Sequence, residues 1–473
     1  MPHHDLVIIG SGSGNSLVTP DLEHLDIAII EGGPVFGGTC LNVGCIPTKM
    51  FVLPADRARD AATSAHLGVR TRFDGADWPA IRDRIFGRID PIAAAGEAYR
   101  RDGERTTLYR GHARFTGERR LVVDLPEGPV EVTADRVVIA AGAHPLIPAA
   151  IAESGVAVHT SDTIMRIDDL PERLLVVGGG FVAAELAHVF ASLGTRVTVA
   201  VRGDGMLTHL DEAIRTPFAQ AAAAQWDVRT RTTVAALEAQ GEVVRVTFAD
   251  GTELEVDEVL VATGRAPSTE HLGCEAAGVD LHPDGRVVVD VHGRTSADGV
   301  WALGDVSSPY MLKHVANQEA RVVAHNLAHP EDLRAFMHRA VPSAVFTHPQ
   351  VATVGMTQSE ARAAGHDVCV YVQDYGSTAY GWALDDTTSR CVLVGDSSTC
   401  ELLGAHLVGP EASTLIQPLI QAMSLGTPLA EMARGQYWIH PALTEVVENA
   451  VIGLLDLMPD TPPHITESTD TPG

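Results

Sequence analysis

Two glycine-rich turns, whose first glycines lie 168 positions apart, constrain the fold of this chain more than any other feature. The first turn contains Gly10, Gly12 and Gly14, and the second contains Gly178 and Gly180. Each comes after a short apolar strand and precedes a predicted helix and a second strand. This is the pattern of a dinucleotide-binding βαβ unit. The sequence therefore predicts two nucleotide-binding halves built on parallel sheets.

The residue at the end of the second strand distinguishes the two nucleotides. Glu31 stands there in the first unit, 21 residues after Gly10, where an acid binds ribose hydroxyls. Asn15 replaces the usual third glycine or alanine of this first turn. In the second unit Val201 takes the place of the acid and Arg202 comes next, and an arginine there accommodates a 2′-phosphate. We therefore expect NADPH rather than NADH in the second unit; a surface arginine of no specific role is the alternative.

Three further apolar strands end in residues suited to a ligand crevice. Two of them end in the small-residue turns at Gly142 and at Gly264-Arg265. The third delivers Asp305 at its carboxyl end, which faces the ligand crevice in open α/β sheets. These turns are expected to complete the two nucleotide sites.

The most specific motif is the segment 37–49, which reads GGTCLNVGCIPTK. On a regular helix, Cα atoms five positions apart would be roughly 8.6 Å from each other, whereas a disulfide needs ~4.4–6.8 Å. If Cys40 and Cys45 pair, the backbone between them cannot be a regular helix, and Asn42 and Gly44 tolerate such a distortion. A redox-active pair near a helix start, where a thiol pKa is lowered, is favoured over a metal site or buried free cysteines.

This segment resembles the signature of the class I pyridine nucleotide-disulfide oxidoreductases, and the resemblance extends from Asp5 to about Leu455. It implies FAD in the first unit, NADPH in the second, a small disulfide as substrate, and a homodimer whose active site is shared between subunits. The implied fold class is α/β, with two Rossmann-like dinucleotide-binding domains and a C-terminal α+β dimerisation domain.

The same resemblance implies a role for individual residues. Cys40 would attack the substrate disulfide, Cys45 would lie against the flavin, and Lys49 would pair with Glu185 near flavin N5. Phe181 would cover the nicotinamide pocket. The cofactor-binding set implied in this way is Gly10, Gly12, Gly14, Glu31, Gly38, Thr39, Gly142, Gly178, Gly180, Phe181, Arg202, Gly264, Arg265 and Asp305. No metal site is expected.

A histidine and a glutamate close to the C-terminus complete the predicted chemistry. Glu445 comes five residues after His440, which suits general acid–base work because the carboxylate holds the imidazole and stabilises the imidazolium. A lone histidine is usually structural, but Pro441 and Glu445 stand in the register of the family. By the resemblance, this pair reaches the cysteines of the other subunit.

The pattern of elements predicts five segments along the chain. They are an FAD-binding domain (1–145), an NADPH-binding domain (146–265), a central segment completing the FAD domain (266–338), a dimerisation domain (339–460) and a disordered tail (461–473). In the fourth segment, strands are expected over 342–346, 368–372, 390–396 and 402–408, with a helix over 413–426. The stretch 341–355 resembles the start of the family's dimerisation domain, and its bland interpretation is a strand and a loop.

Bulk properties exclude several kinds of partner. The formal net charge of −27 argues against nucleic acid and anionic membrane, which need basic patches. No apolar stretch approaches the ~20 residues that span a bilayer, and no targeting segment is visible. Six scattered cysteines do not form a secreted disulfide framework, so we expect a cytoplasmic protein.

The identity of the substrate depends on smaller features. Pro20 stands where glutathione-reducing members carry an arginine, and it suggests an early break in the first helix. The first turn and the stretch 312–317, which contains Lys313 and His314, resemble members that reduce the disulfide of mycothiol, a sugar-based thiol. Glutathione disulfide and lipoamide remain alternatives. A flavoprotein quinone reductase, or a non-catalytic partner, is the alternative from a different class.

Overall fold

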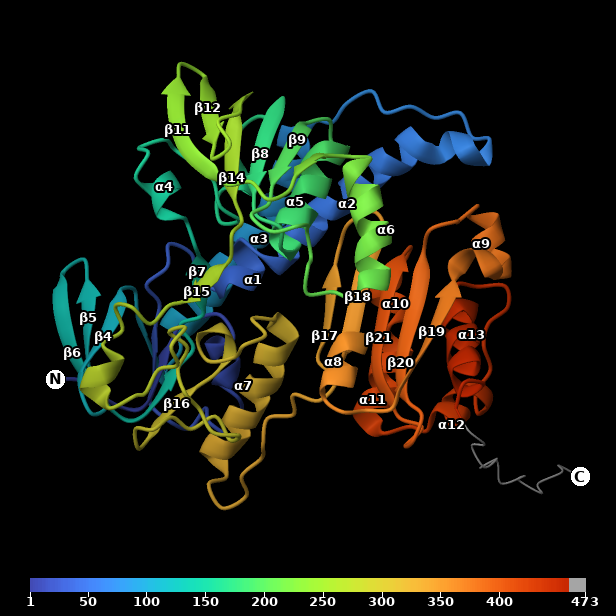
Figure 1. Ribbon diagram of the computed structural model, residues 1–473. Coiled ribbons are helices and arrows are strands. Elements are labelled where there is room, and N and C mark those ends of the chain that lie inside the picture. The colour runs from blue at the N-terminus through green and yellow to red at the C-terminus, as the bar shows by residue number, and fades with distance from the viewer. Residues whose placement is uncertain (459–473) are drawn as a thin grey trace, which may run out of the picture. The chain divides into compact units, whose positions relative to one another are not determined.

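The structure is a computed structural model that describes residues 1–458. It divides into two compact units, drawn in Figure 1. Unit 1 comprises Met1–Phe51, Asp77–Leu170 and Val259–His338, and unit 2 comprises Val52–Ala76, Pro171–Glu258 and the chain from Arg339. The boundary after Phe51 falls inside a continuous helix. The predicted tail, 461–473, lies outside the described residues, and the predicted division into domains stays a prediction.

Unit 1 is built on a seven-stranded sheet of order β3-β2-β1-β6-β5-β4, with β16 paired to β6. Strands β1, β2, β3, β6 and β16 are parallel, whereas β4, β5 and β6 form an antiparallel meander. The strands of the unit are β1 His3–Ile9, β2 Ile27–Ile30, β3 Thr106–Tyr109, β4 His112–Gly117, β5 Arg120–Leu125, β6 Gly128–Ile139, β7 Ala143–Pro145, β15 Arg265–Pro267 and β16 Val300–Ala302, with β14 Glu258–Val261 at the unit boundary. Its helices are η1 Gly14–Leu17, α1 Gly38–Asn42, α3 Trp78–Arg101, α4 Ala149–Ala152, η3 Ile164–Arg166, η4 Cys274–Ala277, η5 Gly304–Val306 and α7 Lys313–Ala328, and α2 Cys45–Thr63 begins here.

The central strand β1 is buried on both faces, as its continuous apolar sequence predicts. Val7 and Ile9 enter one hydrophobic cluster, and Leu6 and Ile8 enter a second cluster on the opposite face. Successive residues of a strand point to opposite faces, so this alternation is a consequence of the strand itself. Helix α7 covers the second face through its apolar side, which includes Val323.

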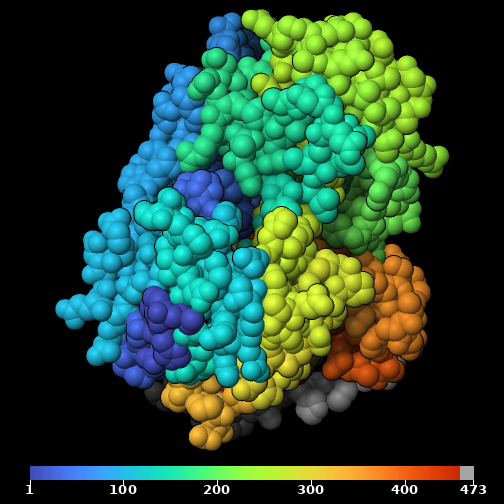
Figure 2. All heavy atoms as spheres, turned by 90° about the vertical axis from the view of Figure 1, so that its left-hand side faces the viewer, coloured from blue at the N-terminus to red at the C-terminus, as the bar shows by residue number. Residues whose placement is uncertain are grey.

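The central segment of the chain returns to unit 1. The backbone N–H of Phe115 in β4 donates to the carbonyl of Leu272 at 2.8 Å, and Leu272 and Val287 are buried in the cluster of the first face. Figure 2 shows this seam, where the yellow part of the chain lies against the cyan strands. The return of this segment brings Asp305, after β16, to the sheet that begins with β1.

The helix predicted after the first glycine turn is wrong in length. The structure has only the single 3₁₀ turn η1, with irregular chain from there until β2. Pro20 gives the physical reason, because its ring has no N–H and clashes with the carbonyl four residues earlier, and it disfavours a helical backbone at Thr19.

The first part of unit 2 contains a parallel sheet and a separate antiparallel sheet. Strands β8, β9 and β10 are parallel, and β11, β12 and β13 form the antiparallel sheet. The elements of this part are η2 Ser64–Leu67, β8 Arg173–Val177, α5 Phe181–Ser192, β9 Arg196–Ala200, α6 Glu212–Ala223, β10 Asp227–Arg229, β11 Val234–Gln240, β12 Val243–Phe248 and β13 Glu253–Val256.

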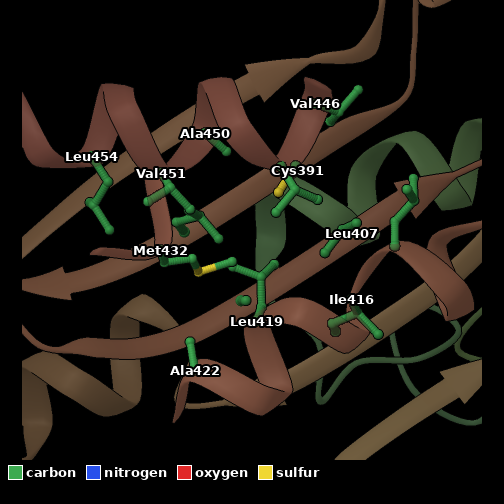
Figure 3. Packing of buried hydrophobic residues seen from close by; sticks show 14 of the residues in the cluster. Cys391, Leu407, Ile416, Leu419, Ala422, Met432, Val446, Ala450, Val451 and Leu454 are labelled. Atoms are coloured by element: carbon green, nitrogen blue, oxygen red, sulfur yellow. The ribbon is translucent and has the colours of Figure 1, made fainter. Parts of the chain in front are cut away.

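The C-terminal part of unit 2 is a five-stranded sheet of order β17-β18-β21-β20-β19. Figure 3 shows its core, in which helix α13 packs Ala450, Val451 and Leu454 towards side chains of α11 and of the sheet. The elements are β17 Pro342–Val345, β18 Gln350–Gly355, α8 Gln358–Ala363, β19 Val368–Asp374, η6 Tyr375–Ser377, α9 Ala379–Ala383, β20 Arg390–Asp396, β21 Leu402–Gly409, α10 Ala412–Leu415, α11 Gln417–Leu425, α12 Leu429–Arg434 and α13 Thr444–Leu455.

Two expectations for this part need correction. The stretch 341–355 holds two antiparallel strands, β17 and β18, rather than a strand and a loop, because the turn around Pro349 reverses the chain and pairs Val345 with Val351. The helix expected over 413–426 is broken into α10 and α11. Pro418 stands in the first turn of α11 and cannot donate a backbone hydrogen bond to the preceding helix.

Candidate active site

The two cysteines of the signature lie on either side of a helix break. Cys40 is in the short helix α1, and Cys45 is the first residue of α2. Val43, between them, has φ −142° and ψ 7°, so the backbone leaves the helical region as the spacing predicts for a pair. A Cβ on Gly44 would lie 3.0 Å from the carbonyl oxygen of Thr39, which shows how closely the chain doubles back.

The structure brings the two sulfurs into contact. The side chain of Cys45 is hydrogen-bonded to Cys40, and this bond, with burial, raises the pKa of the Cys40 thiol. Both thiols are reduced here, and the hydrogen bond between the two sulfurs stabilises the protonated form of Cys40. The lowering of a thiol pKa expected at a helix start stays a prediction. Cys45 is exposed and Cys40 half-buried. The lysine at position 313 acts in the opposite direction and lowers the pKa of Cys40.

Ser11, which sequence reasoning missed, organises the first glycine turn. Its hydroxyl donates to Glu31 Oε2 and accepts the backbone N–H of Gly37 at 2.7 Å. Glu31 also accepts the N–H of Ser11 at 3.0 Å and that of Gly33 at 2.6 Å. The sequence feature that could have identified Ser11 is its position between Gly10 and Gly12 of the fingerprint. These bonds occupy part of the Glu31 carboxylate and leave acceptor capacity for a ligand hydroxyl.

Backbone contact between the first glycine turn and the cysteine segment requires glycine. Gly38 has φ +74°, and a Cβ there would lie 2.5 Å from the Cα of Gly12. Gly10 has φ +104°, and a Cβ there would lie 2.3 Å from the carbonyl oxygen of Ala140. The segment that carries the cysteines thus contacts the first glycine turn through the backbones of Gly38 and Gly12. The exposed Thr39 precedes Cys40 in α1.

Charged residues of unit 1 converge on Asp305. Burial raises the pKa of the Asp305 carboxyl, and the charges of Arg265 and Lys313 oppose that rise. Lys313 Nζ also donates to the hydroxyl of Ser13 at 2.9 Å. Arg265 donates to the carbonyl of Ala143, beside Gly142 and Gly264, whose positive φ angles form the two small-residue turns. A half-buried carboxylate of this kind gains from polar partners, which the hydroxyls of a bound ligand can supply.

The second glycine turn has the helix that the first lacks. Gly178 has φ +135°, and Gly180 is the N-cap of the twelve-residue helix α5 without a side-chain cap. The first N–H groups of α5 therefore have no intrahelical acceptor, and a pyrophosphate binds well at such a helix start. Phe181 is 42% exposed at this start, and Arg202 is exposed after β9.

Lys49 and Glu185 lie in different compact units, so their predicted pairing stays a prediction. Lys49 is half-buried in α2. Glu185 is 3% exposed in α5, and its carboxylate accepts the backbone N–H of Phe346 at 3.0 Å.

His440 and Glu445 form a hydrogen-bonded pair in unit 2. The distance between His440 Nδ1 and Glu445 Oε1 is 2.7 Å, and the histidine side chain is 70% exposed whereas the glutamate is 16% exposed. Helix α13 begins at Thr444 and holds Glu445 in its first turn. With Nδ1 directed at the carboxylate, Nε2 faces outward and is free for proton transfer.

Residues 1–458 contain no cluster of three or more metal-ligating side chains. Within the same residues, no helix is both long and apolar enough to cross a membrane.

Comparison with known proteins identifies the class. The family model of pyridine nucleotide-disulphide oxidoreductases matches residues 4–320, and that of the family's dimerisation domain matches residues 341–451. The chain belongs to the pyridine nucleotide-disulphide oxidoreductase family. It is a flavoprotein disulfide reductase whose cofactors are FAD and NADPH, and the dimerisation domain marks it as a homodimer.

Individual relatives narrow the comparison. Mycothione reductase of Mycobacterium tuberculosis is 52% identical over 463 residues, which cover 96% of this chain and 100% of the relative. Dihydrolipoyl dehydrogenase of Halobacterium salinarum is 31% identical over 94% of this chain and 95% of the relative. The solved Cu(II) complex of the HOCl-induced flavoprotein disulfide reductase RclA from Escherichia coli has a TM-score of 0.85 at 27% identity, covering 96% of this chain and 99% of the other.

The residues present fit both cofactors. In unit 1 the glycine turn suits the pyrophosphate of FAD, the remaining acceptor capacity of Glu31 suits its ribose, and the half-buried carboxylate of Asp305 suits its ribityl group. In unit 2 the uncapped start of α5 suits a pyrophosphate, and Arg202 suits a 2′-phosphate.

Proposed function

We propose that this chain reduces mycothiol disulfide to two thiols at the expense of NADPH, with the Cys40/Cys45 pair as the redox centre. One observation carries the reductase chemistry: the two thiols are hydrogen-bonded across the break between α1 and α2. The choice of substrate is supported by the 52% identity to a mycothione reductase. The choice of NADPH is supported by Arg202, since an arginine after this strand accommodates a 2′-phosphate.

FAD held by the first glycine turn, Glu31 and Asp305 would supply the transfer of two electrons from NADPH to the cysteine pair. The Cys40–Cys45 bond breaks, leaving one thiol and one thiolate. The thiolate is Cys45, and Cys40 passes its proton to His440 of the partner subunit as it attacks one sulfur of the substrate disulfide. A mixed disulfide forms, and the first departing thiolate takes that proton from the histidine; the second is protonated with the proton taken up from solvent. The Cys45 thiolate next attacks the Cys40 sulfur, which restores the internal disulfide and releases the second thiolate.

Proton transfer is assigned to His440 of the partner subunit in the homodimer. Glu445 holds the imidazole through the 2.7 Å bond, so the outward Nε2 can protonate each departing thiolate. The sum is one disulfide, one NADPH and one proton giving two thiols and NADP⁺. Because the histidine and the cysteines would come from different subunits, a monomer would lack a complete site.

Titration of the purified protein with one equivalent of NADPH tests the redox centre. A long-wavelength absorption band between the Cys45 thiolate and the flavin is expected, and Cys45→Ser should abolish it. Absence of the band in the wild type would favour quinone reduction or a non-catalytic role instead. Steady-state rates with mycothiol, glutathione and lipoamide disulfides then test the substrate, with mycothiol disulfide expected to be reduced most efficiently.

A further inference from the structure

One cation of unit 1 has no place in the proposed catalytic cycle. Lys313 is one of only two lysines in a chain that contains 34 basic residues in all, and the other, Lys49, belongs to the cysteine signature. It begins helix α7, is half-buried, and donates from Nζ to the hydroxyl of Ser13 at 2.9 Å. An ammonium is a compact point charge, whereas a guanidinium is a wide planar group. The helix start therefore presents one localised positive charge to the first glycine turn.

The position of Ser13 brings this charge close to the cysteines. Ser13 comes directly after Gly12, whose Cα would be 2.5 Å from a Cβ on Gly38, and Gly38 begins the helix α1 that carries Cys40. The ammonium of Lys313 is thus linked to the cysteine segment by its hydrogen bond to Ser13 and by the close contact between the backbones of Gly12 and Gly38. The start of α7 adds the positive end of a sixteen-residue helix to the same place.

Lys313 acts electrostatically on two groups of unit 1. The titratable groups that act on Cys40 are Cys45, from the start of α2, and Lys313. Those that act on Asp305 are Arg265, from β15, and Lys313. Lys313 therefore acts on both the Cys40 thiol and the half-buried carboxyl of Asp305.

We propose that Lys313 stabilises the single negative charge that the Cys40/Cys45 pair carries once it is reduced. Reduction breaks the sulfur–sulfur bond and leaves one thiol and one thiolate, and Cys40 of this pair is half-buried. A positive charge held by Ser13 offsets the cost of that anion without entering a covalent step. Lys313 is thus a charge-stabilising residue of the pair, and this role rests on the proposed function.

The test measures the thiol itself rather than turnover. In the Cys45→Ser background, Cys40 titrates alone, and its alkylation by iodoacetamide is followed against pH by mass spectrometry of its peptide. Dithiothreitol supplies the reducing conditions, so neither NADPH nor a disulfide substrate is needed. A wrong substrate assignment therefore leaves this measurement unaffected.

Adding Lys313→Gln should raise the pH midpoint of alkylation by about one unit, because removal of a nearby positive charge disfavours the thiolate. Lys313→Arg keeps the charge and should stay close to the parent. Arg321→Gln removes a charge from the exposed side of the same helix and is the matched control, with no shift expected. A Lys313→Gln midpoint equal to that of Arg321→Gln would overturn the proposal.

Ser13→Ala separates charge from tethering. It removes the hydrogen bond but keeps the ammonium, so its shift should be clearly smaller than that of Lys313→Gln; equal shifts would mean that Lys313 acts only by holding the turn. If Lys313→Gln loses its flavin, the same midpoints are compared in flavin-free protein of both variants, because both groups belong to the chain. An unchanged midpoint there would equally refute the role.

Discussion

The two glycine turns share a fingerprint but lead into different elements. After Gly178 the chain forms the twelve-residue helix α5, whose first N–H groups and dipole are available to a phosphate. After Gly10 it forms only the 3₁₀ turn η1. Because so short a turn provides little dipole, the first turn must obtain its order and charge from side chains.

Side chains of distant segments perform that task in unit 1. Lys313 bonds Ser13 from helix α7. Arg100, at the end of α3, donates from Nε to Asn15 Oδ1 at 2.6 Å and from Nη2 to the Asn15 carbonyl at 3.2 Å. Asn15, the residue that departs from the fingerprint, is thus the acceptor for an arginine. One glycine motif can therefore be supported either by a helix or by cations brought from elsewhere in the fold.

Among the substitutions in the two glycine turns, Gly10→Ala should reduce stability the most. The substitution places a Cβ 2.3 Å from a carbonyl oxygen at φ +104°, so we expect a loss of about 3 kcal/mol or more in the stability of unit 1. FAD content per chain and thermal unfolding measure it. A variant that retained full flavin and the wild-type unfolding temperature would contradict the close packing of this turn.

Arg202→Gln tests the nucleotide preference of the second turn. Loss of a charge-assisted bond to a 2′-phosphate should raise the KM for NADPH by about 10- to 100-fold. The KM for NADH, which lacks that phosphate, should be unchanged. Equal changes for the two nucleotides would show that Arg202 does not contact the phosphate.

Arg100→Met tests the support of the first turn. Two bonds to Asn15 are lost, so unit 1 should be destabilised by about 1–2 kcal/mol, and FAD should dissociate more readily. The KM for NADPH should not change, because α5 supports its own turn. Asn15→Ala removes one of the same bonds and should destabilise unit 1 by a smaller amount. If neither variant changed the stability or the FAD content, Arg100 would not support the first turn.

Gly180→Ala should have the smallest effect. Gly180 has φ −85°, and a Cβ there would meet open space, so folding should be unaffected. The new methyl group would narrow the approach of the pyrophosphate, and we expect the KM for NADPH to rise a few-fold. The unfolding temperature of Gly180→Ala should equal that of the wild type within error, unlike that of Gly10→Ala. A large drop would show that both glycine turns are equally intolerant of a side chain.

Local patterns in the sequence predicted most of the regular elements. Strand β20 was predicted at its observed bounds, and β21 differs from its predicted range by one residue, because an uninterrupted apolar run defines a buried strand. The glycine positions were predictable for the same local reason, since a positive φ at Gly10 or Gly178 excludes a side chain. The length of the first helix was not, although Pro20 gave a signal of an early break.

The family, the two nucleotide turns and the cysteine spacing could all be read from the amino-acid sequence, because each depends on residues close together in the chain. The bonds from Lys313 to Ser13 and from Arg100 to Asn15 could not, since they join positions 300 and 85 residues apart. These pairs form only when α7 and α3 pack against the sheet of unit 1. A local sequence pattern does not determine which surfaces of distant segments come into contact.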